Sequence, residues 1–208
     1  MIKEKFFISK FWTTACFLIF ALSCTETFAA GASRTFPLSN EISKVQFIPV
    51  GNVPRDHGPV SKKVVEFQTT ERPGTIIISN SNQSLHHVLG GGKAAKYKIS
   101  VGRDGFSWTG TTIVGRKSEW PDWRPPAEMR KREPNLPKLV PAGPFNPLGA
   151  RAIYLFQNGR DTLYRIHGTN TAETIGGYET SGCFRLSNAD ALELYGKVKI
   201  GSKVIVRN

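Results

Sequence analysis

Cysteine is nearly absent from this chain, which has three among its 208 residues. Two of them, Cys16 and Cys24, fall within the first thirty residues, so the rest of the chain contains Cys183 alone. One thiol cannot form an internal disulfide, and this excludes a disulfide-stapled scaffold. A cysteine that is not needed for a disulfide can serve as a nucleophile when a base such as histidine lies within reach.

Long hydrophobic runs are also scarce. The main one, residues 11–22, follows three lysines and precedes small residues at positions 29–32, which is the pattern of a secretory signal peptide. A run of about a dozen residues is shorter than the roughly 20 that a membrane-spanning helix needs. We therefore expect residues 1–30 to be a cleaved signal and the remainder to be a soluble protein exported to the periplasm. Leu22 is out of place for a lipoprotein processing site, so no lipid is expected on Cys24.

Acidic side chains are few, 16 against 28 lysines and arginines, which gives a formal net charge of +12. Removal of the signal leaves +11, because the signal carries three lysines and two glutamates. Such a charge favours anionic surroundings, such as a carboxylate-rich wall polymer or anionic lipid head groups. Export, and the lack of a basic stripe interleaved with aromatic residues, argue against nucleic acid as a partner. A basic surface that is merely well solvated is the alternative.

Strand signals dominate the chain after an N-terminal extension, residues 31–72, which has only two short apolar runs suited to edge strands. Beta-branched or alternating runs predict strands at residues 75–79, 85–89, 96–101, 111–114, 151–156, 162–167 and 203–207. Ser187 or Asn188 can cap a helix that runs through Tyr195. The fold class is therefore mainly β, with one or two short helices.

Prolines cluster in one segment, because residues 116–149 hold eight of the thirteen. A short helix over residues 125–133 is compatible with them, since a proline costs least in the first helical turn. A loop of this length inside a domain is usually a lid or a binding loop. A packed, proline-stiffened surface insertion is the alternative.

His167 lies sixteen residues before Cys183 and is the first candidate for its base. The dipeptide Asn158-Gly159 between two strand runs is a strong hairpin signal. The second strand of this hairpin would end at His167, where a rigid backbone can hold a base. Strand alternation places Leu163, Arg165 and His167 on one face of that strand.

The residues around Cys183 suit a nucleophile. A free thiol has a pKa of about 8.5 and is only a few per cent thiolate at neutral pH, so His167 would have to take its proton. Gly182 would let backbone N–H groups approach a developing oxyanion. Arg185 could hold a substrate carboxylate through two hydrogen bonds, or fix the loop.

Two other patterns give no support to a cofactor. His86 and His87 would point to opposite faces of a strand, so joint metal binding is not expected. The run Gly90-Gly91-Gly92 lacks the spacing of a phosphate-binding loop and predicts a hairpin turn. The sequence therefore predicts neither a metal nor a cofactor.

The sequence resembles the signature of the L,D-transpeptidase catalytic domain family, YkuD type. The signature residues are the run His167-Gly168-Thr169-Asn170 and the run from Thr180 to Asn188, T-S-G-C-F-R-L-S-N. The resemblance extends over about residues 73–206 and includes the runs 120–126 and 146–151. It implies a catalytic domain over residues 73–208, with an L,D-transpeptidase-type β-sandwich or barrel-like sheet and the proline-rich segment as a lid loop.

By this resemblance, the protein is an enzyme that acts on peptidoglycan stem peptides. Cys183 would attack the carbonyl of the third residue, a diamino acid, expel the terminal D-alanine and form a thioester. The acyl group would pass to an amine of another stem, of a D-amino acid or of an outer-membrane protein. His167 would be the general base, oriented by the backbone carbonyl of Gly168. Carbapenems acylate the cysteine of this family, so acylation is expected here too.

A predicted substrate-binding set surrounds this pair: Arg185, Asn188, Asn146, Arg151 and Trp123, with Trp120 beside them. For the last four, packing or loop anchoring is the alternative. Ser181 stands where many family members have a second histidine, and with Gly182 it belongs to the oxyanion loop. Phe184 is bulkier than the isoleucine or valine usual at its position.

Two alternative functions stay open at this level. Water could replace the acceptor amine, which would make the protein a peptidoglycan L,D-carboxypeptidase or hydrolase. The domain could also be a non-catalytic wall-binding module. The sequence does not decide among the acceptors.

Overall fold

The computed structural model describes residue 58 and residues 60–208, which belong to one unit of the chain, Gln46–Asn208. The predicted signal with Cys24, and the first apolar run of the extension, lie outside the described residues. The second run forms an edge strand, β1 (Lys63–Glu66). No helix within the described part of the chain is long and apolar enough to cross a membrane.

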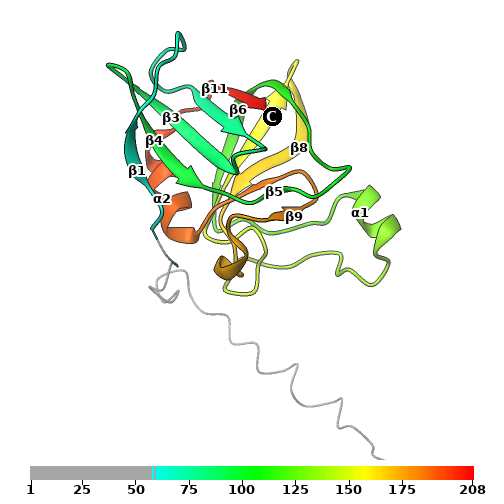
Figure 1. Cartoon of the computed structure of the whole chain (residues 1–208). Helices are drawn as coiled ribbons and strands as arrows, with labels where there is room; N and C mark the ends of the chain where they lie inside the picture. The colour runs from blue at the N-terminus through cyan, green and yellow to red at the C-terminus, as the bar shows by residue number, and fades with distance from the viewer. Residues whose placement is uncertain (1–57, 59) are drawn as a thin grey trace, which may run out of the picture. The chain divides into compact units, whose positions relative to one another are not determined.

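In the described residues, nine strands form one continuous sheet, with a separate two-stranded pair (Figure 1). The order across the sheet is β1, β4 (Lys93–Lys98), β3 (Ser84–Gly90), β2 (Ile76–Ser79), β11 (Lys203–Arg207), β6 (Gly110–Glu119), β7 (Arg151–Gln157), β8 (Arg160–His167) and β10 (Phe184–Arg185). Neighbours are antiparallel except β2–β11 and β8–β10. The pair consists of β5 (Val101–Gly102) and β9 (Tyr178–Thr180). The mainly β prediction is confirmed, and the sheet of the described residues is open, not a closed barrel.

The core lies on the face of the sheet that α2 (Asn188–Lys197) covers. Its large side chains come from the strands of the sheet and from α2: Ile76, Ile78, Leu85, Tyr97, Val114, Leu155, Ile166, Phe184, Leu194 and Val206. Burying one such side chain stabilises the fold by about 1.5–3 kcal/mol. The predicted helix is confirmed, and its cap is Ser187, whose Oγ accepts from the Asp190 N–H at 3.1 Å.

The predicted hairpin at Asn158-Gly159 joins β7 to β8. Both residues have positive φ, 51° and 74°, as the tight hairpin turn favoured by this dipeptide requires. Gln157 pairs with Arg160 directly across the turn. The hairpin thereby holds β8 rigidly, with His167 at its far end.

Two strand boundaries differ from the predicted ones. The run predicted as one strand over 96–101 ends at Lys98, because Ser100 turns away to form a bridge with Arg185. The strand predicted over 111–114 continues to Glu119. A bulge at Gly115 hides this continuation from an alternation pattern, since it shifts the register between β6 and β7. Only glycine suits this bulge, because a Cβ there would lie 2.3 Å from the Phe156 ring.

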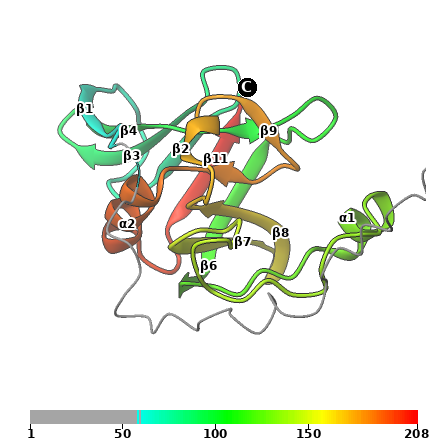
Figure 2. The ribbon, with the colours of Figure 1, turned by 90° about the horizontal axis from the view of Figure 1, so that it is seen from below.

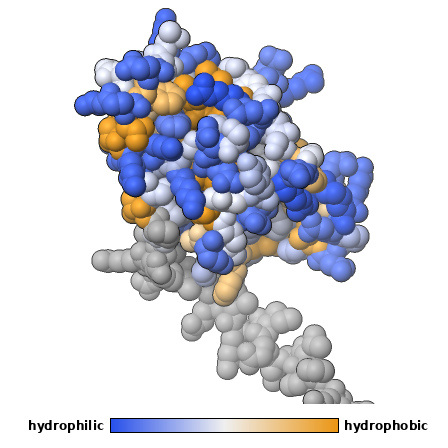
Figure 3. Space-filling view, viewed as in Figure 1, coloured by the Kyte–Doolittle hydropathy of each residue, from blue (hydrophilic) through white to orange (hydrophobic). Residues whose placement is uncertain are grey.

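The proline-rich segment forms a projection beside the sheet. Its helix, α1 (Ala127–Arg132), stands away from the strands in both ribbon views (Figures 1 and 2). The two arms of the segment are joined by hydrogen bonds in both directions between Trp123 and Val140, at 2.8 and 2.9 Å. The face seen in Figure 3 is largely hydrophilic, and apolar residues show there only in small patches.

Candidate active site

Cys183 and His167 are carried by adjacent parallel strands. His167 is the last residue of β8, and Cys183 directly precedes β10, whose Arg185 pairs with His167. Because side chains alternate along a strand, Cys183, Arg185 and His167 share one face of the sheet. Phe184 and Ile166 are buried on the other face. Both reactive side chains therefore line one cleft of about 790 Å³.

The imidazole of His167 has a defined tautomer. Its Nδ1 lies 2.6 Å from the carbonyl oxygen of Gly168, and the ring is buried. A carbonyl can only accept a hydrogen bond, so Nδ1 carries the proton and Nε2 keeps its lone pair. Nε2 is thus the atom that can act as a base.

The protonation equilibria of the pair are set mainly by burial. Burial, reinforced by the positive charge of Arg185, lowers the pKa of His167 to about 3. Burial also raises the pKa of the Cys183 thiol, although the Arg165 backbone N–H and the charges of Arg165 and Arg185 oppose this effect. The resting pair is therefore a neutral thiol and a neutral imidazole.

The thiol of Cys183 lies against the backbone of β8. Its sulfur is 3.9 Å from the carbonyl oxygen of Leu163, a residue with φ of 65°, which is rare for a branched side chain. The N–H of Leu163 donates to the Asp161 carboxylate at 2.8 Å, and this bond helps to hold the unusual conformation. Among the described residues, Cys183 is the one free cysteine.

Gly182 fixes the turn that presents the nucleophile. Its φ is 104°, and a Cβ there would lie 2.6 Å from the ring of Tyr164. Its carbonyl accepts from Nε1 of Trp108 at 3.1 Å, and the Trp108 indole stacks on Tyr164 with centroids 4.5 Å apart. Thr180 closes the turn, because its hydroxyl accepts from the Gly182 N–H and donates to the Cys183 carbonyl.

This bonding changes the expected oxyanion site. The N–H of Gly182 is already used by Thr180, at 3.1 Å, so it is not available to a developing oxyanion. The neighbouring N–H group of Cys183 is then the candidate for that role.

Other predicted residues do lie in the cleft. Ser181, Arg185, Trp120 and Trp123 line it together with the catalytic pair. One Arg185 N–H donates to the Thr174 hydroxyl at 2.9 Å, which ties this side chain to the segment before β9. The arrangement therefore brings together six of the predicted site residues.

Three predicted substrate-binding residues are not among those that line the cleft: Asn188, Asn146 and Arg151. Oδ1 of Asn188 accepts from the N–H groups of Ala150 and Thr169, at 2.8 and 3.1 Å. The Asn146 amide donates to three carbonyls of the proline-rich segment and is 1% exposed. Arg151 pairs with Glu119 at 3.1 Å. Their polar groups bond to the scaffold, and their role in substrate binding stays a prediction.

Sequence reasoning missed several cleft residues, among them Arg116 and Tyr154. Tyr154 is on β7 and pairs with Arg165 in the β7–β8 ladder, and Arg116 is on β6, one strand further from β8. An isolated glycine in a strand pattern, here Gly115, was the available signal that the alternation of β6 changes before Arg116.

The two histidines set aside in the sequence have separate surroundings. His86 stacks on Phe67 with centroids 4.4 Å apart, and His87 is buried and pairs with Ile76 across the ladder. In the part of the chain that the structure describes, no three His, Cys, Asp or Glu side chains are grouped as metal ligands would be.

A cysteine beside a neutral histidine, in a cleft of a mainly β domain, defines the class of cysteine acyl-transfer proteins. The family model described as "L,D-transpeptidase catalytic domain" matches residues 73–206. The chain belongs to this family.

Two relatives come from Escherichia coli K12. The chain is 38% identical over 144 residues to "Probable L,D-transpeptidase YbiS", covering 65% of this chain and 44% of the relative. It is 42% identical over 116 residues to "Probable L,D-transpeptidase ErfK/SrfK", covering 52% and 35%. The matched region thus spans less than half the length of either relative.

A solved structure shares the fold. An L,D-transpeptidase from Mycobacterium smegmatis superposes with a TM-score of 0.50 and 18% identity, covering 64% of this chain and 58% of that one.

Proposed function

We propose that this protein is an exported cysteine L,D-transpeptidase that acts on peptidoglycan stem peptides. One observation carries the proposal: Cys183 and His167 line the same cleft, and the bond from His167 to Gly168 leaves Nε2 as a base. Family membership supplies the reaction class, and the stem peptide is the substrate that this class implies.

In the first half-reaction, the Cys183 thiol gives its proton to Nε2 of His167 while the sulfur attacks the carbonyl carbon of the third stem residue. The tetrahedral intermediate then collapses and breaks the bond to the nitrogen of the terminal D-alanine. The imidazolium returns the proton to that nitrogen, so D-alanine leaves as an amine and the acyl group remains on sulfur as a thioester.

In the second half-reaction, an acceptor amine attacks the thioester carbon. His167 takes a proton from the amine and gives one to the departing sulfur. An amide bond replaces the thioester, and the neutral thiol and imidazole are restored. No net proton or electron is gained or lost by the protein.

The cleft disfavours an ion pair of thiolate and imidazolium in the resting enzyme and stabilises the charge that develops during the attack. Because the resting pair is neutral, proton transfer accompanies the formation of the bond to sulfur. The side chains of Arg165 and Arg185 stabilise negative charge on that sulfur, since both lower the pKa of the thiol. The N–H of Cys183 would receive the oxyanion.

The proposed acceptor is an amine of another stem, of a D-amino acid or of an outer-membrane protein. Export to the periplasm is supported by the signal pattern of residues 1–30. The net charge of +11 that is left after removal of the signal would concentrate the protein near anionic wall polymers.

Product analysis tests this proposal. The protein is incubated with disaccharide-tetrapeptide, with and without a D-amino acid, and the products and intact protein are followed by mass spectrometry. We expect release of D-alanine, a tripeptide acyl adduct on Cys183, and dimers or exchanged stems. Cys183→Ala should give none of these.

Three results would contradict the proposal. Activity in Cys183→Ala would exclude the thioester. Tripeptide as the sole product would make the protein a hydrolase. An unreactive thiol, together with retained binding to purified sacculi, would make it a wall-binding module.

A further inference from the structure

Arg116 is a cation in the catalytic cleft that pairs with no carboxylate among the described residues. Its neighbour Arg165 is different, because it forms two bonds to the Asp161 carboxylate, at 2.7 and 2.9 Å. The positive charge of Arg165 is thus largely compensated within the protein. Arg116 supplies the uncompensated charge on this wall of the cleft.

Tyr154 holds the guanidinium of Arg116 in place. The central guanidinium carbon lies 3.4 Å from the centroid of the Tyr154 ring, and that of Arg165 lies 4.3 Å from it. Tyr154 is buried apart from 6% of its surface, so its ring is a fixed platform. A guanidinium stacked on such a ring is attracted by the electron-rich ring face, and its N–H groups, which lie in the plane of the guanidinium, stay available for another partner.

These residues form a row that leads to the nucleophile. Arg116 pairs with Tyr154 across β6–β7, and Tyr154 pairs with Arg165 across β7–β8. Cys183 is one step before Phe184, the partner of Ile166, so it stands at the level of Arg165. Arg116, Tyr154, Arg165 and Cys183 all line the cleft.

A bulge directs Arg116 into this row. Val114 is fully buried in the core, and without a bulge Arg116 would share its face, because residues two apart on a strand point the same way. The extra residue, Gly115, reverses the alternation, and Arg116 reaches the cleft. The register of β8 shifts opposite the same residue, Leu155. The pairing of β7 with both of its neighbours, β6 and β8, is therefore irregular next to Tyr154, where the two arginines contact its ring.

We propose that Arg116 binds a carboxylate of the stem peptide, with Tyr154 as its platform. This inference rests on the proposed function and names the group that the cleft recognises. Two carboxylates of a stem belong to the residues that share the scissile bond: the one of the terminal D-alanine, and the one at the end of the side chain of a diaminopimelate-type third residue. An arginine binds either through two parallel hydrogen bonds.

The geometry favours the side-chain carboxylate. Tyr154 and Cys183 are two strands apart, or roughly 10 Å at the usual strand spacing. The terminal carboxylate lies one residue beyond the scissile carbonyl, and one extended residue spans only about 3.5 Å. A diaminopimelate side chain bridges more of this distance.

Steady-state kinetics with three peptides tests the inference: the tetrapeptide stem, its C-terminal amide, and its side-chain amide at the third residue. With the unmodified stem, Arg116→Gln should raise KM roughly tenfold, because a charge-assisted hydrogen bond is lost, and should leave kcat nearly unchanged. The difference in KM between wild type and Arg116→Gln should vanish with the side-chain amide. If it vanishes with the C-terminal amide, the bound group is the terminal carboxylate.

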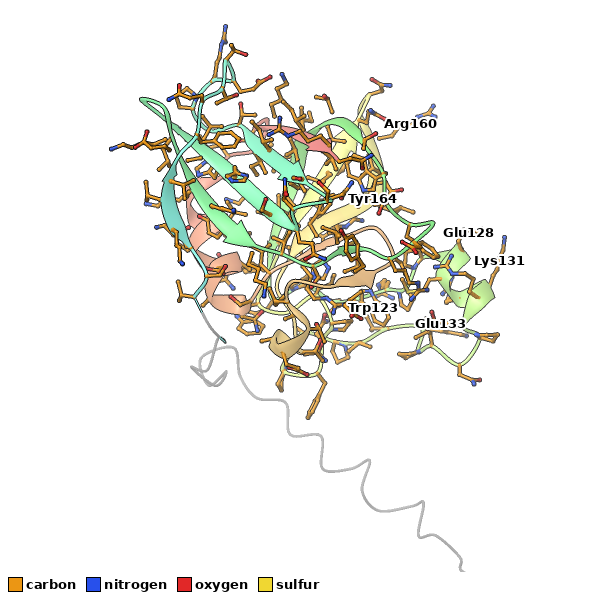
Figure 4. All side chains as sticks on the ribbon, viewed as in Figure 1. Trp123, Glu128, Lys131, Glu133, Arg160 and Tyr164 are labelled. Carbon is orange, nitrogen blue, oxygen red and sulfur yellow. The ribbon has the colours of Figure 1, made fainter. Side chains whose placement is uncertain are left out.

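An unchanged KM in Arg116→Gln, or an equal penalty with all three peptides, would overturn the inference. The KM of Arg116→Lys should fall between those of the wild type and Arg116→Gln, since an ammonium keeps the charge but cannot make the two parallel hydrogen bonds of a guanidinium. Arg160→Gln is the matched control, because it removes the same charge from the outer end of β8, well away from Trp123 in the cleft (Figure 4).

A second measurement separates this inference from the proposed function. Calorimetric titration of Cys183→Ala with the same three peptides needs no turnover. A wild type that processes no peptide would refute the proposed function. The Kd is compared between Cys183→Ala and the double variant that also carries Arg116→Gln. A difference in Kd that vanishes with one of the two amides would still establish the carboxylate site, and an equal Kd in both proteins for all three peptides would refute it.

Discussion

Nδ1 of His167 is bonded at 2.6 Å to the carbonyl oxygen of Gly168, the next residue in the chain. The base is therefore oriented by backbone, and no carboxylate of the described residues is bonded to its ring. Without a negative partner, the imidazolium has little to stabilise it, which agrees with the lowered pKa of His167.

We expect the acylation rate of Cys183 to lack an acid limb near pH 6.5. His167 has a pKa of about 3, so it is a neutral base at all higher pH values. The raised pKa of Cys183 means that thiolate adds to the rate only at alkaline pH. The measurement is the rate of acylation by a carbapenem from pH 4 to 10 at fixed ionic strength. A rate that halves near pH 6.5 would contradict the neutral pair.

The folded state should lose stability as the pH falls below about 6.5. His167 and His86 have pKa values of about 3 and about 4 in the folded protein, against 6.5 when unfolded. Between these values the unfolded chain binds more protons, so acid favours unfolding. For the buried His167, the loss approaches 1.4 kcal/mol per pH unit until about pH 3.

Urea unfolding at pH 7 and pH 4 measures this effect. His86→Gln is the informative variant, because it lies outside the cleft and should flatten the pH dependence while activity is kept. A midpoint that is equal or higher at pH 4 would show that the histidines do not govern acid stability.

Gly182→Ala should destabilise the protein and abolish acylation. The new Cβ would lie 2.6 Å from the Tyr164 ring at a φ of 104°, so the turn that presents Cys183 must move. The expected cost is about 1–3 kcal/mol. Gly196→Ala is the matched control, since nothing lies within 4 Å of a Cβ in that turn of α2 and alanine is the better helix former. Thermal melts and carbapenem adducts compare the two, and equal behaviour would contradict the packing argument.

Asn188→Ala should lower stability more than Asn188→Asp does. Alanine leaves the N–H groups of Ala150 and Thr169 without their acceptor, at about 1–3 kcal/mol for each buried donor, whereas aspartate keeps two acceptor oxygens. KM for the stem should change little in Asn188→Asp. A large rise in KM with unchanged stability would instead restore the substrate-binding role that the sequence suggested.

The parts of the fold that depend on short local signals were predictable. The Asn158-Gly159 turn and the Ser187 cap each act locally, so a short stretch of sequence contains all the information. The motif around Cys183 likewise placed the nucleophile and its base in one site.

The elements that the sequence concealed depend on distant partners. Gly115 becomes a bulge because the Phe156 ring fills the place of its Cβ. Ser100 leaves its strand because Arg185 offers it backbone hydrogen bonds. Asn146 is drawn inward by three carbonyls. Each depends on residues at least five positions away, and most on residues dozens of positions away, which periodicity does not register.

Neighbouring strands of the sheet fix the distance between the sulfur of Cys183 and the guanidinium stacked on Tyr154, because hydrogen-bonded strands are about 4.8 Å apart. That distance can change only in whole steps of this spacing. A stem must therefore present its reacting carbonyl and its carboxylate at one of a few allowed intervals. A relative that selects a longer or shorter third residue would carry its cation on a different strand, and the length of the substrate side chain could then be read from the strand on which the arginine stands.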